Sequence, residues 1–222
     1  MRLASLQPSV APSQHMSTTV DALLPLSFLE AVRNVDSPDG DLDAEFVPEL
    51  RNKRLGLSDT VYAQIKRYTD AARRKERPVF DEAVGLARLI GRRPDAEAVF
   101  RAAGRYLAMQ TYLSIPAPTR RMITVLPAIL SRPIALRHVE RIAARFLNGK
   151  VRRSGSYLTL EVARSATLDS APRGAGCAYY EAVLQELLRL LGASGGAVDH
   201  VRCAGKGEGL CEWRAEWRSI SH

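Results

Sequence analysis

The chain has no long run of apolar residues, few cysteines and few aromatic residues. No stretch approaches the roughly 18 consecutive apolar residues of a membrane-spanning helix, and the first twenty residues contain no apolar run of signal-peptide length. The three cysteines are an odd number, which argues against a disulfide framework and is typical of a reducing compartment. We therefore expect a cytoplasmic protein that is neither secreted nor membrane-spanning, with no membrane as a partner.

Lysine is also scarce. Of the 32 basic residues 27 are Arg and 5 are Lys, and against 24 acidic residues they give a net charge of +8. Such an excess of positive charge permits binding to nucleic acid through its phosphates. The arginines, however, are scattered over several predicted elements and lack interleaved aromatic residues that would stack on bases. We do not expect nucleic acid as a partner, and DNA binding through the helices from Ser58 to Ala103 remains a lesser alternative.

The first two thirds of the chain are typical of helices. Residues 1–18, rich in Ser, Pro and Gln, predict a disordered tail, and residues 19–57 predict a docking helix and a linker. In residues 58–148 apolar side chains recur with the period of a helix, which predicts a helical region. We expect its helices to begin at Ser58 or Asp59, at about Phe80, at Pro94-Asp95, at about Thr119 with a kink at Pro127, and at Pro133.

From Gly149 onward the pattern changes to strands. Residues 149–222 predict an α/β region that forms one domain with the helical region before it. We expect a strand over 156–162, an amphipathic helix from Cys177 to near Gly192, and two strands over 197–203 and 210–218 that are joined by a glycine-rich turn. The predicted fold class is therefore α+β: a helical N-terminal half followed by a small antiparallel sheet with a packed helix.

Cys177, His200, Cys203 and Cys211 form an ordered set of metal-ligating residue types. Three thiolates and one imidazole suit a tetrahedral zinc ion and close the site to water and substrate. Cys177 begins a predicted helix, where the helix dipole favours a thiolate. Because His200 and Cys203 would face opposite sides of a regular strand, the site needs a β-bulge or a turn between them. The alternative is that the cysteines are small buried side chains and His200 is an ordinary strand residue.

The order of these elements resembles the 4-vinyl reductase domain: a strand, a helix that begins at Cys177, a strand that ends at Cys203, a glycine-rich turn and a strand that begins at Cys211. That family is related to the ligand-binding folds of haem nitric-oxide sensors and Golgi transport components. The resemblance covers roughly the last 110 to 120 residues and implies a bacterial protein with zinc as its cofactor. In sensors of aromatic effectors that carry this domain, zinc is held by three cysteines at this spacing and an acidic residue, whose position is taken here by His200.

Besides DNA binding, two functions are consistent with these features. The leading hypothesis is a zinc-stabilised domain that binds or senses a small hydrophobic or aromatic ligand, without catalysis and in a regulatory role, with a homodimer left open. The resemblance also implies an alternative, an enzyme or accessory protein in (bacterio)chlorophyll 4-vinyl reduction, although the chain has no dinucleotide-binding fingerprint. We expect the ligand pocket to lie between the helices of residues 98–146 and the sheet, lined by Tyr106, Met109, Tyr112 and Ile123.

Overall fold

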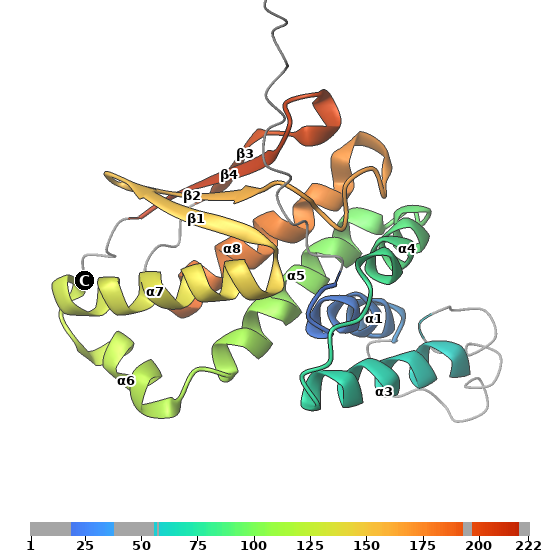
Figure 1. Cartoon of the computed structure of the whole chain (residues 1–222), viewed down its shortest axis with the longest axis horizontal. Helices are drawn as coiled ribbons and strands as arrows, with labels where there is room; N and C mark the ends of the chain where they lie inside the picture. Colours follow the sequence, from blue (N-terminus) through green and yellow to red (C-terminus); the bar gives the residue numbers. More distant parts are fainter. Residues whose placement is uncertain (1–18, 38–55, 57, 193–196, 218–222) are drawn as a thin grey trace, which may run out of the picture.

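The computed structural model describes residues 19–37, 56, 58–192 and 197–217, so the predicted tail, most of the predicted linker and the last residues lie outside it. Its architecture is α+β, as the sequence predicts (Figure 1). The α-helices are Leu23–Asp36 (α1), Asp59–Arg73 (α3), Phe80–Gly91 (α4), Ala96–Leu113 (α5), Ala117–Val125 (α6), Ala128–Phe146 (α7) and Ala178–Leu190 (α8). The strands are Gly149–Ser154 (β1), Tyr157–Val162 (β2), Val198–Arg202 (β3) and Cys211–Glu216 (β4), with 3-10 helices at Pro172–Cys177 (η3) and Ala204–Lys206 (η4).

The four strands form one sheet in the order β1-β2-β4-β3, and every neighbouring pair is antiparallel. Along β2 and β4 buried and partly exposed side chains alternate, because successive side chains of a strand point to opposite faces. The partly exposed face of the sheet carries ion pairs such as Arg152 with Glu161 (3.4 Å) and Arg202 with Glu212 (3.7 Å). The buried face carries Leu158, Leu160, Val162, Cys211, Trp213 and Ala215.

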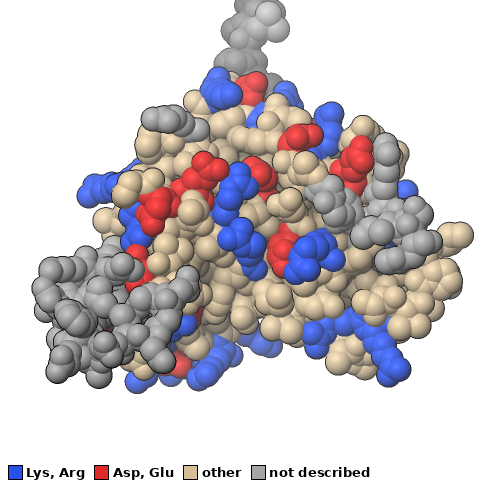
Figure 2. Space-filling view, turned by 180° about the vertical axis from the view of Figure 1, so that it is seen from behind, with Lys and Arg blue, Asp and Glu red and all other residues tan. Residues whose placement is uncertain are grey.

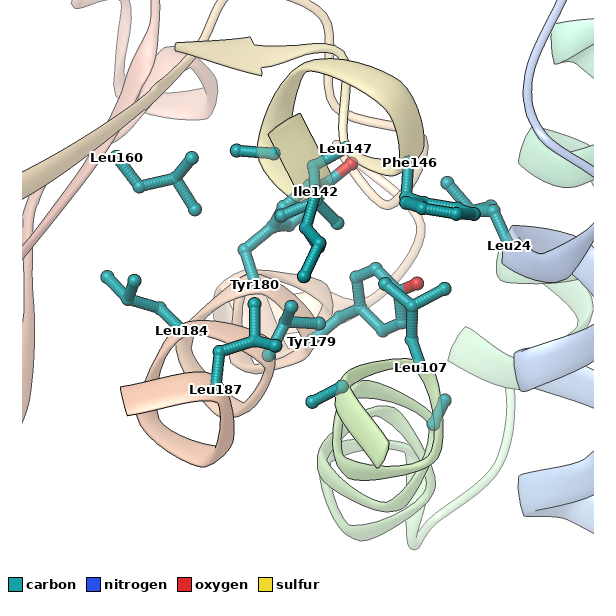
Figure 3. Close-up of a cluster of buried hydrophobic side chains, with 14 of the residues drawn as sticks. Leu24, Leu107, Ile142, Phe146, Leu147, Leu160, Tyr179, Tyr180, Leu184 and Leu187 are labelled. Atoms are coloured by element: carbon teal, nitrogen blue, oxygen red, sulfur yellow. The ribbon is translucent and has the colours of Figure 1, made fainter. Parts of the chain in front are cut away.

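Helix α8 lies between this buried face and helices α5 and α1. It contacts β3 and β4 on one side and α5 on the other, while α1 packs on α5 and α7 packs on β1 (Figure 1). Adjacent residues of a helix are about 100° apart around its axis, so Tyr179 faces Phe28 of α1 while Tyr180 stacks on Trp213 of β4. Figure 3 shows the two tyrosines at the centre of the core, with Leu107 of α5 beside Tyr179. Helix α8 is therefore apolar around most of its circumference.

Several predicted boundaries are confirmed and two are wrong. Ser58 caps α3, where its side chain accepts a hydrogen bond from the Val61 N–H (3.3 Å). Pro127 does not kink a helix but separates α6 from α7, and Pro133 lies inside α7 instead of at its start. Because Pro133 lies in the second turn it removes only one backbone hydrogen bond, and the packing of α7 on β1 and α6 maintains the helix.

Strand β1 was not expected from the sequence. Its composition is polar, with Lys150, Arg152 and Arg153 among six residues, and none of the usual strand-forming aromatic residues. It forms because it pairs along its whole length with β2 across a tight turn, in which Gly155 has a φ of +59°. An edge strand can be polar because its outward side chains remain in water.

Gly104 allows α5 and α8 to approach each other closely. A Cβ atom at this position would lie 2.4 Å from the backbone oxygen of Tyr179 and 2.9 Å from the Cβ of Ala182, so the two helices would have to separate. We expect Gly104→Ala to lower the free energy of unfolding by about 1–3 kcal/mol, as measured by urea denaturation.

Gly85→Ala in α4 is the matched control for this substitution. No atom lies within 4 Å of the Cβ that it would add, and replacing a helical glycine by alanine is expected to stabilise the protein by about 0.5–1 kcal/mol. Equal effects of the two substitutions would contradict a tight contact at Gly104.

Candidate metal centre

Four metal-ligating side chains from separate parts of the chain converge at the edge of the sheet that β3 and β4 form. Cys177, His200, Cys203 and Cys211 each offer one ligand atom, and these atoms all lie within 4.8 Å of one another. Sulfur atoms around a tetrahedral zinc ion lie about 3.8 Å apart, given bonds of about 2.3 Å. The three thiols are free. All four predicted ligands are therefore brought together, and the cluster could bind a metal ion.

Cys177 lies at the N-terminus of α8, as predicted, and the segment before it is held tightly. A Cβ atom on Gly176 would lie 2.3 Å from the backbone oxygen of Thr167, so only glycine fits there. The hydroxyl of Thr167 donates a hydrogen bond to the carbonyl of Gly176 (2.6 Å). These contacts position the backbone directly before Cys177 and hold its thiol beside Cys211.

A β-bulge brings His200 and Cys203 to the same site. The pairing of β3 with β4 shifts between His200, which is opposite Trp213, and Arg202, which is opposite Glu212. One extra residue on β3 changes the direction of the side chains that follow it. This finding confirms the predicted irregularity between the two ligands.

The turn between β3 and β4 is organised around its two cysteines. The backbone N–H of Ala204 donates a hydrogen bond to the Sγ of Cys211 (3.4 Å). The carboxylate of Glu208 accepts a hydrogen bond from the backbone N–H of Cys203 (2.5 Å). Gly207 has a φ of +84°, a conformation that favours glycine, and it closes the short η4 helix. The turn therefore holds both sulfur atoms in place.

His200 is positioned by an aromatic neighbour. Its ring stacks on the ring of Trp213, with centroids 4.8 Å apart and planes 12° apart, and Trp213 stacks in turn on Tyr180 (5.0 Å). The Nε2 atom of His200 is buried and has no hydrogen-bond partner among the described residues. Burying such a nitrogen without a partner is costly. A metal ion bound to the three sulfurs is a partner that this nitrogen fits.

The sulfur atoms of Cys177 and Cys211 influence each other strongly. The hydrogen bond with Cys177 lowers the pKa of Cys211, against the opposing effect of burial. The same hydrogen bond, together with burial, raises the pKa of Cys177 far above its ordinary value. Two adjacent buried thiolates repel each other, so without a cation the pair retains a proton. A divalent cation would neutralise both, and the donor set fits one.

A cavity of about 370 Å³ opens beside the cluster. This volume is within the usual range for small-molecule sites. Two cysteines of the cluster line the cavity, and both apolar and charged side chains form the rest of its wall. Its lining comprises Thr167, Leu168, Asp169, Ala171, Gly174, Cys177, Cys203, Gly205 and Lys206.

The four residues that the sequence predicts to line a ligand pocket are distributed between two hydrophobic clusters and the surface. Tyr106 packs against a small hydrophobic cluster of α1 and α3, whereas Ile123 belongs to the main core. Tyr112 packs against the main core with the guanidinium of Arg120 over its ring (5.3 Å), and Met109 is 37% exposed. None of the four lines the cavity beside the cysteines. A pocket among them stays a prediction.

Two residues that support the site, Glu208 and Thr167, were not identified from the sequence. Glu208 lies within the glycine-rich turn, and an acidic residue between two cysteine ligands is a signal that could have indicated a backbone contact. Thr167 gives no such signal, because its hydrogen bond to Gly176 depends on how the loop before η3 folds back.

Searches of protein-family models, of curated proteins and of solved structures found no match for this chain. The function is therefore inferred from the site and its surroundings.

Glu208→Ala tests whether the turn organises the cluster. Loss of the contact to the Cys203 N–H should weaken metal binding by about tenfold or more, as substitutions behind metal ligands commonly do. Affinity would be measured by competition with a chromophoric chelator. Glu140→Ala on the exposed surface of α7 is the control, and equal affinities of the two variants would contradict a role for Glu208.

Proposed function

We propose that the protein is a zinc-stabilised domain that binds a small hydrophobic or aromatic molecule and has a regulatory, non-catalytic role. The convergence of three thiols and a buried, unpartnered imidazole nitrogen carries the metal part of this proposal. The cavity beside the cluster supports the ligand-binding part. The resemblance to the 4-vinyl reductase domain, in which zinc accompanies sensing of aromatic compounds, supports both.

The donor set favours zinc among the common metals. Thiolate and imidazole ligands are soft or borderline and suit zinc, whereas magnesium and calcium prefer oxygen ligands. Four protein ligands fill a tetrahedron and leave no position for water or substrate, which is the arrangement of a structural ion. This closed arrangement favours a regulatory domain over the alternative of a metal-dependent enzyme in 4-vinyl reduction.

The metal and the cavity share their walls. Cys177 ends η3, which follows the loop that lines one side of the cavity, and Cys203 begins the turn that lines the other side. An ion bound to both cysteines would tie these two segments together and keep the cavity open at a defined width. Ligand affinity would then depend on the metal, although the metal itself performs no chemistry on the ligand.

The zinc content of the purified protein tests the metal part. We expect about one equivalent of zinc, and its removal by a chelator should lower the midpoint of thermal unfolding by about 10 °C or more. His200→Ala should weaken zinc binding, whereas His138→Ala on α7, outside the cluster, should not. Less than about a tenth of an equivalent, with stability unchanged by the chelator, would contradict the proposal.

Binding of small fluorinated aromatic compounds, followed by 19F NMR, tests the ligand part. Ala171→Leu fills part of the cavity and should weaken binding of any hit by about tenfold while the zinc content stays the same. Ala144→Leu on the exposed surface of α7 adds the same atoms away from the cavity and serves as the control. If both variants bind equally well, the ligand does not occupy this cavity.

A further inference from the structure

The corner between α6 and α7 exposes an unusual amount of apolar surface. The nine residues from Met122 to Leu130 contain a single polar residue, Thr124, yet most of them are exposed. Exposed apolar patches of this kind usually mark interaction surfaces. The exposed fractions are 51% for Leu113 at the end of α5, 48% for Met122, 73% for Val125, 84% for Ile129 and 56% for Leu130.

We define the α6–α7 corner as Leu113 together with residues 122–130. Its buried side is anchored in the core of the protein. Ile123 is 5% exposed and belongs to the main core. Helix α6 packs chiefly on α7, and the extended backbone of Pro127 links the two. In Figure 1 the corner lies at the lower left, away from the sheet. Its exposed side chains therefore project outward from a formed pair of helices.

The chain around the corner carries positive charge only. Between Glu97 and Glu140 the sequence has no acidic residue. Directly before the apolar segment Arg121 is exposed, whereas Arg120 is half-buried with its guanidinium over the ring of Tyr112. Arg132, also half-buried, follows the segment. In the view from behind, the lower right of the molecule, on the side where α6 lies, shows Lys or Arg and uncharged surface without Asp or Glu (Figure 2). The corner thus combines exposed apolar side chains with a cationic rim.

We propose that the α6–α7 corner binds the surface of a membrane that contains anionic lipids. Val125, Ile129 and their apolar neighbours would enter the headgroup region, while the flanking arginines would contact lipid phosphates. A second copy of the chain fits less well, because a symmetric contact would bring two identical sets of arginines together. A projecting corner also suits a flat lipid surface better than a partner helix, which binds in a groove.

This contact is peripheral. Within the described part of the chain, no helix combines the length and the apolar character that crossing a membrane requires. The expectation of no membrane partner rested on the lack of a spanning segment, and an interfacial contact needs none. The inference is independent of the zinc site and of its cavity, which lie on other elements.

Co-sedimentation of the full chain with vesicles tests the proposal. The protein should bind vesicles of mixed phosphatidylglycerol and phosphatidylcholine at least about tenfold more tightly than vesicles of phosphatidylcholine alone, and high salt should weaken this binding. The double variant Val125→Ser with Ile129→Ser should lose at least about tenfold in affinity, because its apolar side chains are the ones that insert. Both side chains are largely exposed, so thermal unfolding should be unchanged.

Leu89→Ser is the matched control, because Leu89 is 51% exposed on α4 and lies outside the corner. It should leave vesicle binding unchanged. The proposal is overturned if the wild-type protein does not bind the anionic vesicles, or if the double variant binds them as tightly as the wild type. It is also overturned if light scattering shows a stable dimer that the double variant converts to a monomer, since a second copy would then occupy the corner.

Discussion

The position of α8 is the constraint on which the other parts of the structure depend. This helix is packed on α5 through the close approach at Gly104 and on the sheet through the stacking of Tyr180 on Trp213. Its apolar side chains serve both contacts, because adjacent residues of a helix point about 100° apart. A displacement of α8 would therefore separate the helical layer from the sheet and would also move Cys177, the residue directly before the helix.

The metal centre is coupled to the same packing. The rings of Tyr179, Tyr180, Trp213 and His200 form a continuous series of contacts from the helical core to the cluster, with centroids 4.8 to 5.1 Å apart. Aromatic pairs of this kind contribute about 0.5–1.5 kcal/mol each beyond the area that they bury. Core packing therefore orients the imidazole, and an ion bound to it would in turn hold the hairpin and the start of α8 together.

The two surfaces to which we assign a role lie on different parts of the fold. The cavity is formed by the loop before α8 and by the β3–β4 turn, whereas the apolar corner is formed by α6 and the start of α7. Helix α7 packs on β1, at the edge of the sheet opposite to β3. A small ligand and a membrane surface could thus be bound at the same time without competing for the same side chains.

Local patterns in the sequence were sufficient to predict most of the helices and strands. The helical period of the first part, the cap at Ser58 and the alternation of β2 and β4 are each properties of a short segment. Local patterns did not predict the polar strand β1, because its pairing with β2 outweighs its local preference. Nor did they predict the course of the chain around Pro127 and Pro133, where the packing of α7 has the same effect.

Some features of the candidate site likewise follow from the sequence, and others follow only from the tertiary structure. Residue type and spacing alone indicated the four ligands and the need for a bulge between His200 and Cys203. Only the tertiary structure placed Trp213 against His200, Thr167 against Gly176 and a cavity beside the cysteines, since these contacts join segments that are brought together by folding. The sequence by itself determined which atoms can bind a metal. The tertiary structure decided whether they meet and which surface lies beside them, because contacts between distant segments depend on how the whole core packs.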